Sequence, residues 1–344
     1  MVVAKVCVKC RSSMLSVWKL RLSMIGTLAI IFGLSTLVFT IVLMLFGGSL
    51  GFIAIGVFVV IFYFAQWLLS PYLVGAIYKV KELKPNDNPQ VYQMVKELSA
   101  KSKMSMPKVM LAQIALPNAF AYGSPLTGNR VAVTQGLLNS LDKGEIEAVI
   151  GHELGHLKHR DVQVMMTVSF LPTLFFYIGY SLMLSGIFGG RNRNNGGSNA
   201  LIGIAFIAFS WLLNLFTLSL SRLREYYADR HSVAIVENGA TKLSTGLVTI
   251  VNESKNHNRF RRNNTNRQNQ QKNNSSFKTL FISDPDSTTT TNTEEPSYTN
   301  TPNNKQALLN EFLSKKITGA EKFAELFSTH PNITKRLRAL QTQT

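Results

Sequence analysis

The stretch from Gly151 to His156 reads G-H-E-L-G-H and combines residue types that can hold a metal ion and move a proton. His152 and His156 are four residues apart, so on a helix both imidazoles lie on one face and can bind one metal ion. Glu153 follows the first histidine and is placed to accept a proton from a water that the metal activates. Considered alone, the five-residue pattern H-E-x-x-H also occurs by chance, so the rest of the chain has to supply support.

A catalytic metal site needs a third protein ligand and an open position. Residues 222–229 read R-L-R-E-Y-Y-A-D and offer Glu225 as that ligand. Asp229, four residues further on, can hydrogen-bond the free nitrogen of a ligating histidine. The acidic pair could instead neutralise the neighbouring arginines at a membrane surface. The histidine pair upstream favours the ligand interpretation, and a His-His-Glu set favours one Zn²⁺ per chain over other divalent ions.

Long stretches without Asp, Glu, Lys or Arg indicate where the chain crosses a membrane. They cover residues 22–78, 162–190 and 194–221. A helical crossing needs about 20 apolar residues, so the first stretch has room for two crossings and the others for one each. We expect the second crossing to end at Ser70-Pro71, because proline disfavours further regular helix. The four predicted transmembrane helices cover residues 24–46, 50–69, 165–188 and 200–220.

Basic residues gather before the first predicted span, after the second and after the fourth, whereas the loop between the first two spans has no charge. Cytoplasmic flanks are enriched in lysine and arginine. We therefore expect a multi-pass protein of the cell membrane with both termini and the metal site on the cytoplasmic side. Topology signalling by these flanks and their attraction to the membrane surface then account for the net charge of +17. No nucleic-acid partner is therefore expected.

The segments outside the membrane differ in character. Residues 79–161 indicate a compact soluble unit, in which strand-like runs at 108–111 and 130–133 flank a turn-rich stretch and predict a small hairpin or sheet. Asp142 and Glu145 form a capping-box pair at the start of the helix that carries the histidines. The remaining segments are a basic N-terminus (1–23), a second part of the soluble domain with the third ligand (221–251), an Asn- and Thr-rich insertion predicted to be disordered (252–304), and a helical C-terminal part (305–344).

The combination of G-H-E-L-G-H, S-R-L-R-E-Y-Y-A-D and four hydrophobic segments resembles the HtpX family of membrane zinc peptidases. That family belongs to the wider M48 group that includes the Ste24 CaaX proteases. The resemblance extends to P-N-A-F-A-Y-G at 117–123, to residues 131–138 and to T-H-P at 329–331, and the long polar insertion departs from it. It implies a mainly α membrane protein with four transmembrane helices and a cytoplasmic, gluzincin-like α+β metalloprotease domain containing a small β-sheet.

The same resemblance implies roles for single residues. His152, His156 and Glu225 would bind the zinc, and Glu153 would be the general base. His330 would approach the cleft and stabilise the oxyanion, although from the residues alone it could equally be an exposed imidazole in a turn. The stretch at Asn118, Ala119 and Phe120 would form an edge near the cleft, where an extended substrate backbone could pair.

These observations predict a zinc-dependent membrane endopeptidase that hydrolyses membrane or misfolded proteins at the cytoplasmic side. An intramembrane protease is excluded, because charged residues surround the histidine motif. Two alternatives stay open: a non-enzymatic membrane scaffold that retains a metal site, and a CaaX-type processing protease, for which we expect more than four spans. The residues do not identify a substrate, a cleavage preference, an oligomeric state, or a role for the insertion or for Cys7 and Cys10.

Overall fold

The structure is a computed structural model that describes residues 52–188, 196–265 and 302–343. From Phe58 onward the described chain belongs to one compact unit. The first predicted span, both cysteines and most of the Asn-rich insertion lie outside the described residues.

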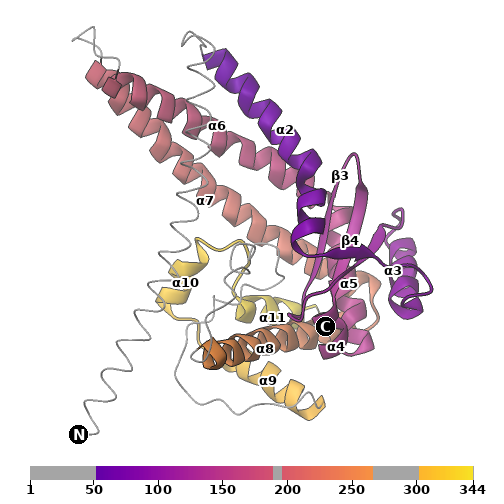
Figure 1. The fold of residues 1–344 in the computed structure, drawn as a ribbon. Helices are drawn as coiled ribbons and strands as arrows, with labels where there is room; N and C mark the ends of the chain where they lie inside the picture. Colours follow the sequence, from indigo (N-terminus) through magenta and orange to yellow (C-terminus); the bar gives the residue numbers. More distant parts are fainter. Residues whose placement is uncertain (1–51, 189–195, 266–301, 344) are drawn as a thin grey trace, which may run out of the picture. The chain divides into compact units, whose positions relative to one another are not determined.

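The described chain is mostly helical with one small sheet (Figure 1). The helices are α2 (Phe52–Ile77), α3 (Pro89–Lys101), α4 (Gln135–Ser140), α5 (Lys143–Lys158), α6 (Asp161–Phe188), α7 (Gly196–Ile235), α8 (Gly239–Thr265), α9 (Pro302–Ser314), α10 (Gly319–Glu325) and α11 (Ile333–Gln341). The strands are β1 (Val80–Glu82), β2 (Lys108–Ala112), β3 (Ala119–Ser124) and β4 (Gly128–Thr134).

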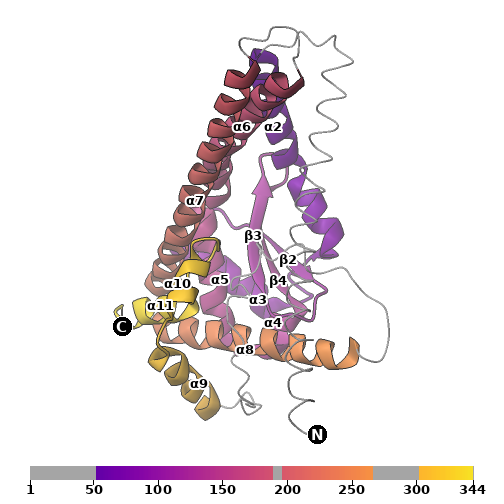
Figure 2. The same ribbon diagram turned by 90° about the vertical axis from the view of Figure 1, so that its left-hand side faces the viewer.

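Among the described residues, α2, α6 and α7 are long and apolar enough to cross a membrane. Helices α6 and α7 run side by side in both views (Figures 1 and 2). Their approach depends on small residues, since a Cβ on Gly179 would come within 2.7 Å of the carbonyl oxygen of Gly203. Helix α7 has 40 residues, or about 60 Å at 1.5 Å per residue. That is about twice the hydrocarbon thickness of a bilayer, so α7 is longer than one crossing requires.

The expectation that regular helix ends at Pro71 was wrong, because α2 continues through this proline to Ile77. A proline inside a helix removes the N–H that would bond to the carbonyl four residues earlier, here that of Trp67. The hydroxyl of Ser70 donates to this carbonyl instead, at 3.0 Å. One side-chain hydrogen bond thus replaces the missing backbone bond, and the helix tolerates the proline.

The four strands form a mixed sheet in the order β1-β2-β4-β3. Strands β2 and β4 are parallel, whereas β1 pairs antiparallel with β2 and β3 pairs antiparallel with β4. The register of the β3–β4 pair runs from Ala119 opposite Val133 to Ser124 opposite Gly128. The predicted small sheet is therefore present, and β3 occupies an edge of it.

Helix α5 is central to the soluble part, where it packs against α7, α8, α3 and β3. The predicted capping box is formed, with Glu145 Oε2 accepting from the backbone N–H of Asp142 at 3.0 Å. Val149, Ile150 and Leu154 are completely buried in the hydrophobic core. The helix with the two histidines is thus held by neighbours on several sides.

The boundary of the polar insertion differs from the prediction. Residue 252 was expected to begin a disordered segment, but α8 continues through Thr265. Tertiary contacts with α9 explain the continuation: Ser254 is buried, and the ammonium group of Lys255 lies 5.1 Å from the centre of the Phe312 ring. Polar composition alone therefore underestimates the length of a helix that packs one face against another helix.

Candidate metal centre

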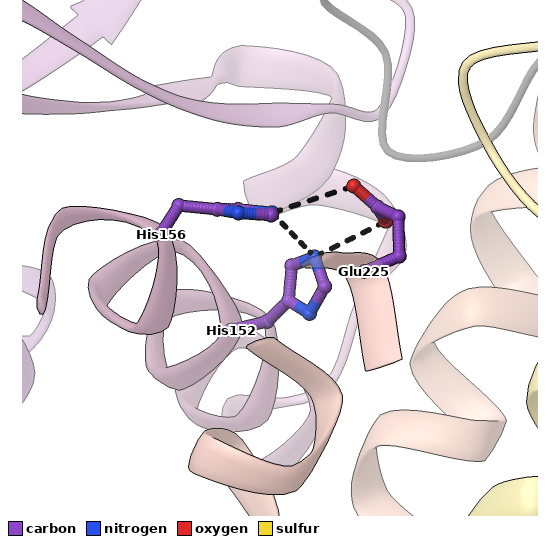
Figure 3. A group of neighbouring side chains, drawn as sticks. All are labelled: His152, His156 and Glu225. Carbon is purple, nitrogen blue, oxygen red and sulfur yellow. Dashed lines mark hydrogen bonds and ion pairs between the residues drawn. The ribbon is translucent and has the colours of Figure 1, made fainter. Parts of the chain in front are cut away.

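The structure brings together the three predicted ligands, two from α5 and one from α7 (Figure 3). The Nε2 atoms of His152 and His156 are 3.2 Å apart. Glu225 Oε2 lies 3.6 Å from His152 Nε2, and Glu225 Oε1 lies 3.5 Å from His156 Nε2. One donor atom from each residue can be chosen so that all lie within 4.8 Å of one another.

The two glycines of the motif allow α7 to approach α5 closely. A Cβ on Gly155 would be 3.0 Å from the Cα of Ala228, and one on Gly151 would be 3.1 Å from Ser232 Oγ. The hydroxyl of Ser232 also donates to the carbonyl of Ala148 at 2.6 Å, which ties the two helices together. The glycines in G-H-E-L-G-H therefore bring Glu225 within reach of the histidines.

Each of the two histidines lies against its own aspartate. His152 Nδ1 lies 2.9 Å from Asp229 Oδ1, and His156 Nδ1 lies 2.7 Å from Asp161 Oδ2. An ionised carboxylate only accepts hydrogen bonds, so each Nδ1 carries a proton and each Nε2 is the nitrogen that faces the centre of the site. At 3.2 Å the two Nε2 atoms need a cation between them, which is either a proton that one donates to the other or a metal ion. The donor set therefore fits a divalent metal ion, and two histidines with one glutamate are typical of catalytic zinc sites.

Two arginines hold the acidic residues in place. Arg336 on α11 is almost completely buried and pairs with Asp229 through Nε at 3.0 Å and Nη2 at 2.6 Å. Its Nη1 lies 2.9 Å from Glu225 Oε2, so one guanidinium holds both Glu225 and Asp229. On the other side of the site, Arg224 forms an ion pair with Asp161.

The electrostatics of the buried site follow from these pairs. Burial lowers the pKa of His152, but the carboxylates of Asp229 and Glu225 outweigh it and raise that pKa to about 9. Burial and the neighbouring His152 lower the pKa of His156. Burial also lowers the pKa of Arg336, yet Asp229 and Glu225 raise it above its ordinary value, so this arginine stays charged. A proton and a metal ion therefore compete for His152 Nε2.

The other predicted site residues lie as follows. Glu153 is buried on α5 between the two histidines in sequence. His330 lies in the turn before α11, with Nδ1 3.3 Å from Glu225 Oε1. The side chains of Asn118, Ala119 and Phe120 are buried, and the last two lie on the edge strand β3.

Sequence reasoning did not identify Asp161, Arg224 or Arg336 as parts of the site. A signal for Arg336 was present, because it lies on the same face of α11 as the buried Ile333, Leu337 and Leu340. A charged residue on an apolar helix face has to find a buried partner. Asp161 and Arg224 had no comparable signal, since both looked like ordinary charges at the ends of membrane spans.

Comparison with known proteins defines the class to which this fold and donor set belong. The model of the family described as "Peptidase family M48" matches residues 85–344. The chain belongs to this family, which confirms the interpretation of the sequence motifs.

The relatives have related names. A "Protease HtpX homolog" of Thermoplasma acidophilum is 38% identical over 278 residues, covering 80% of each chain. A "Protease HtpX homolog 2" of Saccharolobus solfataricus is 35% identical over 338 residues, covering 94% of this chain and 96% of that protein. The crystal structure of S. mikatae Ste24p has a similar fold, with a TM-score of 0.54 at 15% identity, covering 94% of this chain and 66% of that chain. Membership of family M48 and the apolar helices make this chain a membrane metalloprotease by family.

Proposed function

We propose that this chain is a zinc-dependent endopeptidase that cuts membrane or misfolded proteins at the membrane surface. The observation that carries the proposal is the convergence of His152, His156 and Glu225 on one point, with Glu153 on the same buried helix as the histidines. A site that only held the ion for structural reasons would have no need of an acid beside the first ligand.

The chain's own residues would divide the chemistry as follows. Zinc bound at the site would polarise the scissile carbonyl and lower the pKa of a nearby water toward about 7. Glu153 would take the proton of the attacking water and pass it to the leaving amine. Asp229 would keep the imidazole of His152 in the orientation that binding requires. His330 would donate a hydrogen bond to the oxyanion.

Strand β3 is the proposed binding edge for the substrate backbone. It pairs with β4 alone in the described sheet, and an edge strand presents unpaired backbone groups to an extended peptide. The backbone N–H and C=O of Asn118 already bond to Thr134, so pairing with a substrate backbone would fall to Ala119, Phe120 and the residues that follow them on β3. Helix α5 packs against β3, which supports a peptide path next to the metal ligands.

The position of the site relative to the membrane supports substrates that emerge from the bilayer. On α7 the charge-free part ends at Ser221, and the proposed ligand Glu225 follows Arg222 by three residues, which is about one helical turn. The lysine and arginine flanks support four spans, with both termini and this site on the cytoplasmic side.

A comparison of Glu153→Gln with Glu147→Gln tests the proposal. Glu147 lies on the same helix and pairs with Lys242 near the surface, which makes it a matched control. Each variant would be purified in detergent and assayed on casein and on a quenched peptide from a membrane-protein loop, with and without a zinc chelator, while bound metal is measured. We expect Glu153→Gln to retain zinc and to lose cleavage about 10²–10⁴-fold. Bound zinc without cleavage of either substrate by the unmodified protein would favour the scaffold alternative.

A further inference from the structure

The end of α7's membrane-spanning part is marked by Arg222, the first charged residue after the charge-free stretch. This arginine is tied to the turn that follows α10. Its Nη1 donates to the backbone carbonyls of Glu325 at 2.9 Å, Leu326 at 3.3 Å and Ser328 at 2.8 Å. The C-terminal end of α10 is therefore held at the level where α7 leaves the bilayer.

This end of α10 exposes a group of large apolar side chains, which we call the α10 patch: Phe323, Leu326 and Phe327. They are 65%, 47% and 52% exposed, and the two phenylalanine rings lie 5.5 Å apart in an edge-to-face arrangement. The inner side of the helix is polar and well fixed, because Glu321 is buried and closes a capping box with Thr318. The apolar side is thus the exposed side of a capped helix.

Basic residues accompany the α10 patch. Lys322 directly precedes Phe323 in the sequence, Lys316 lies in the segment that leads into α10, and both are exposed. A short helix with aromatic and aliphatic residues on one side and lysines around them is typical of segments that lie in a membrane interface. Lysines near the surface are attracted to anionic headgroups, and aromatic rings favour the headgroup layer.

We propose that Phe323, Leu326 and Phe327 insert into the headgroup layer of the bilayer, so that α10 is an interfacial anchor beside the end of α7. The continuity with a membrane-spanning helix through Arg222 selects the bilayer as the occupant of this surface. The anchor would also hold the turn that carries His330, which begins directly after the patch and reaches Glu225.

Labelling at Phe323 tests the anchor independently of peptidase activity, so its failure can be told apart from failure of the proposed function. Cys7 and Cys10 would be replaced by serine, and Phe323→Cys would carry an environment-sensitive fluorophore in the full chain, reconstituted in phosphatidylcholine nanodiscs with and without phosphatidylglycerol. Lys96→Cys on α3 is the control, because Lys96 is exposed and lies in the soluble part. Leu326→Cys is a second labelling position in case Phe323→Cys folds poorly.

Lipids with a spin label near the headgroup should quench the fluorophore at 323 at least about twofold more than at 96, and phosphatidylglycerol should increase this difference. Equal quenching at 323 and 96, with equal access to iodide, would overturn the proposal. Protection from both lipid quencher and iodide would also overturn it, because another segment of the chain would then cover the patch. Protection that appears only when unfolded casein is added would assign the patch to polypeptide binding instead.

Discussion

Replacing Asp161 with asparagine is expected to weaken metal binding without removing any ligand. Asp161 Oδ2 lies 2.7 Å from His156 Nδ1, and its other oxygen pairs with Arg224. In Asp161→Asn, the hydrogen bond to the histidine loses its charge, and charge-assisted bonds are about twice as strong as neutral ones. The new amide nitrogen would also face the guanidinium, which is a donor opposite a donor.

The size of the effect can be set from this geometry. The side chains of Asp161 and Arg224 are only 10% and 12% exposed, so solvent compensates little for the lost charge. Loss of a group that orients a metal ligand typically costs about 10–100-fold in metal affinity. This corresponds to about 1.4–2.7 kcal/mol of binding free energy.

The assay is competition for Zn²⁺ between the purified protein and a chromophoric chelator, with Glu147→Gln as the control from the same helix. Arg224→Met should weaken zinc binding less than Asp161→Asn, because the aspartate keeps its contact with His156. The double variant should then be close to Asp161→Asn alone, as expected for residues that act through one contact. The reasoning would be refuted by a folded Asp161→Asn protein whose zinc affinity is within about twofold of that of the unmodified chain. The contact with His156 would then contribute less than the expected tenfold in affinity.

Two further predictions concern the support of the centre. Gly155→Ala should destabilise the fold by about 1–3 kcal/mol, because its Cβ would press on the α7 backbone. The control Gly144→Ala, next to the flexible Lys242 side chain, should be neutral or stabilising by up to about 1 kcal/mol. Equal unfolding temperatures of the two variants in detergent would contradict this prediction. Lys305→Met should lower the free energy of unfolding by about 3 kcal/mol, because buried Glu145 loses its cation. This value is near the lower end for a broken buried ion pair, because the other partner of Lys305, Asp142, is 74% exposed and is solvated without it. Lys242→Met, at a pair nearer the surface, should cost about 0–1 kcal/mol, and a comparable shift in both lysine variants would show that burial is not the cause.

The parts of the fold that depend on local signals could be predicted from the sequence. The capping box at Asp142 and Glu145 marked the start of α5, and the strand-like runs marked β2 and β4. The grouping of His152, His156 and Glu225 followed from helical spacing and a shared side of the membrane. In each case the information lies within a few neighbouring residues or in a charge pattern.

The parts that depend on tertiary contacts could not be predicted in the same way. Asp161 meets His156 across the short turn between α5 and α6, where Arg160 has a φ of 54°, and arginine is not a residue that signals such a conformation. Arg336 meets Asp229 only after the C-terminal helix docks on the site. The extent of α2 past Pro71 depended on a single hydroxyl, and that of α8 on the packing of α9.

The charge balance of the centre gives a reason for its composition. Four carboxylates lie in or beside it (Glu153, Asp161, Glu225 and Asp229), and two of their charges are matched by the guanidiniums of Arg224 and Arg336. When all four are ionised, two negative charges remain, which is what a divalent cation neutralises. The carboxylates of Asp229 and Glu225 raise the pKa of His152 to about 9 despite burial, so a proton is the other cation that this site can take up. The aspartate–arginine pairs therefore orient the histidines and also set the charge that the metal ion has to supply.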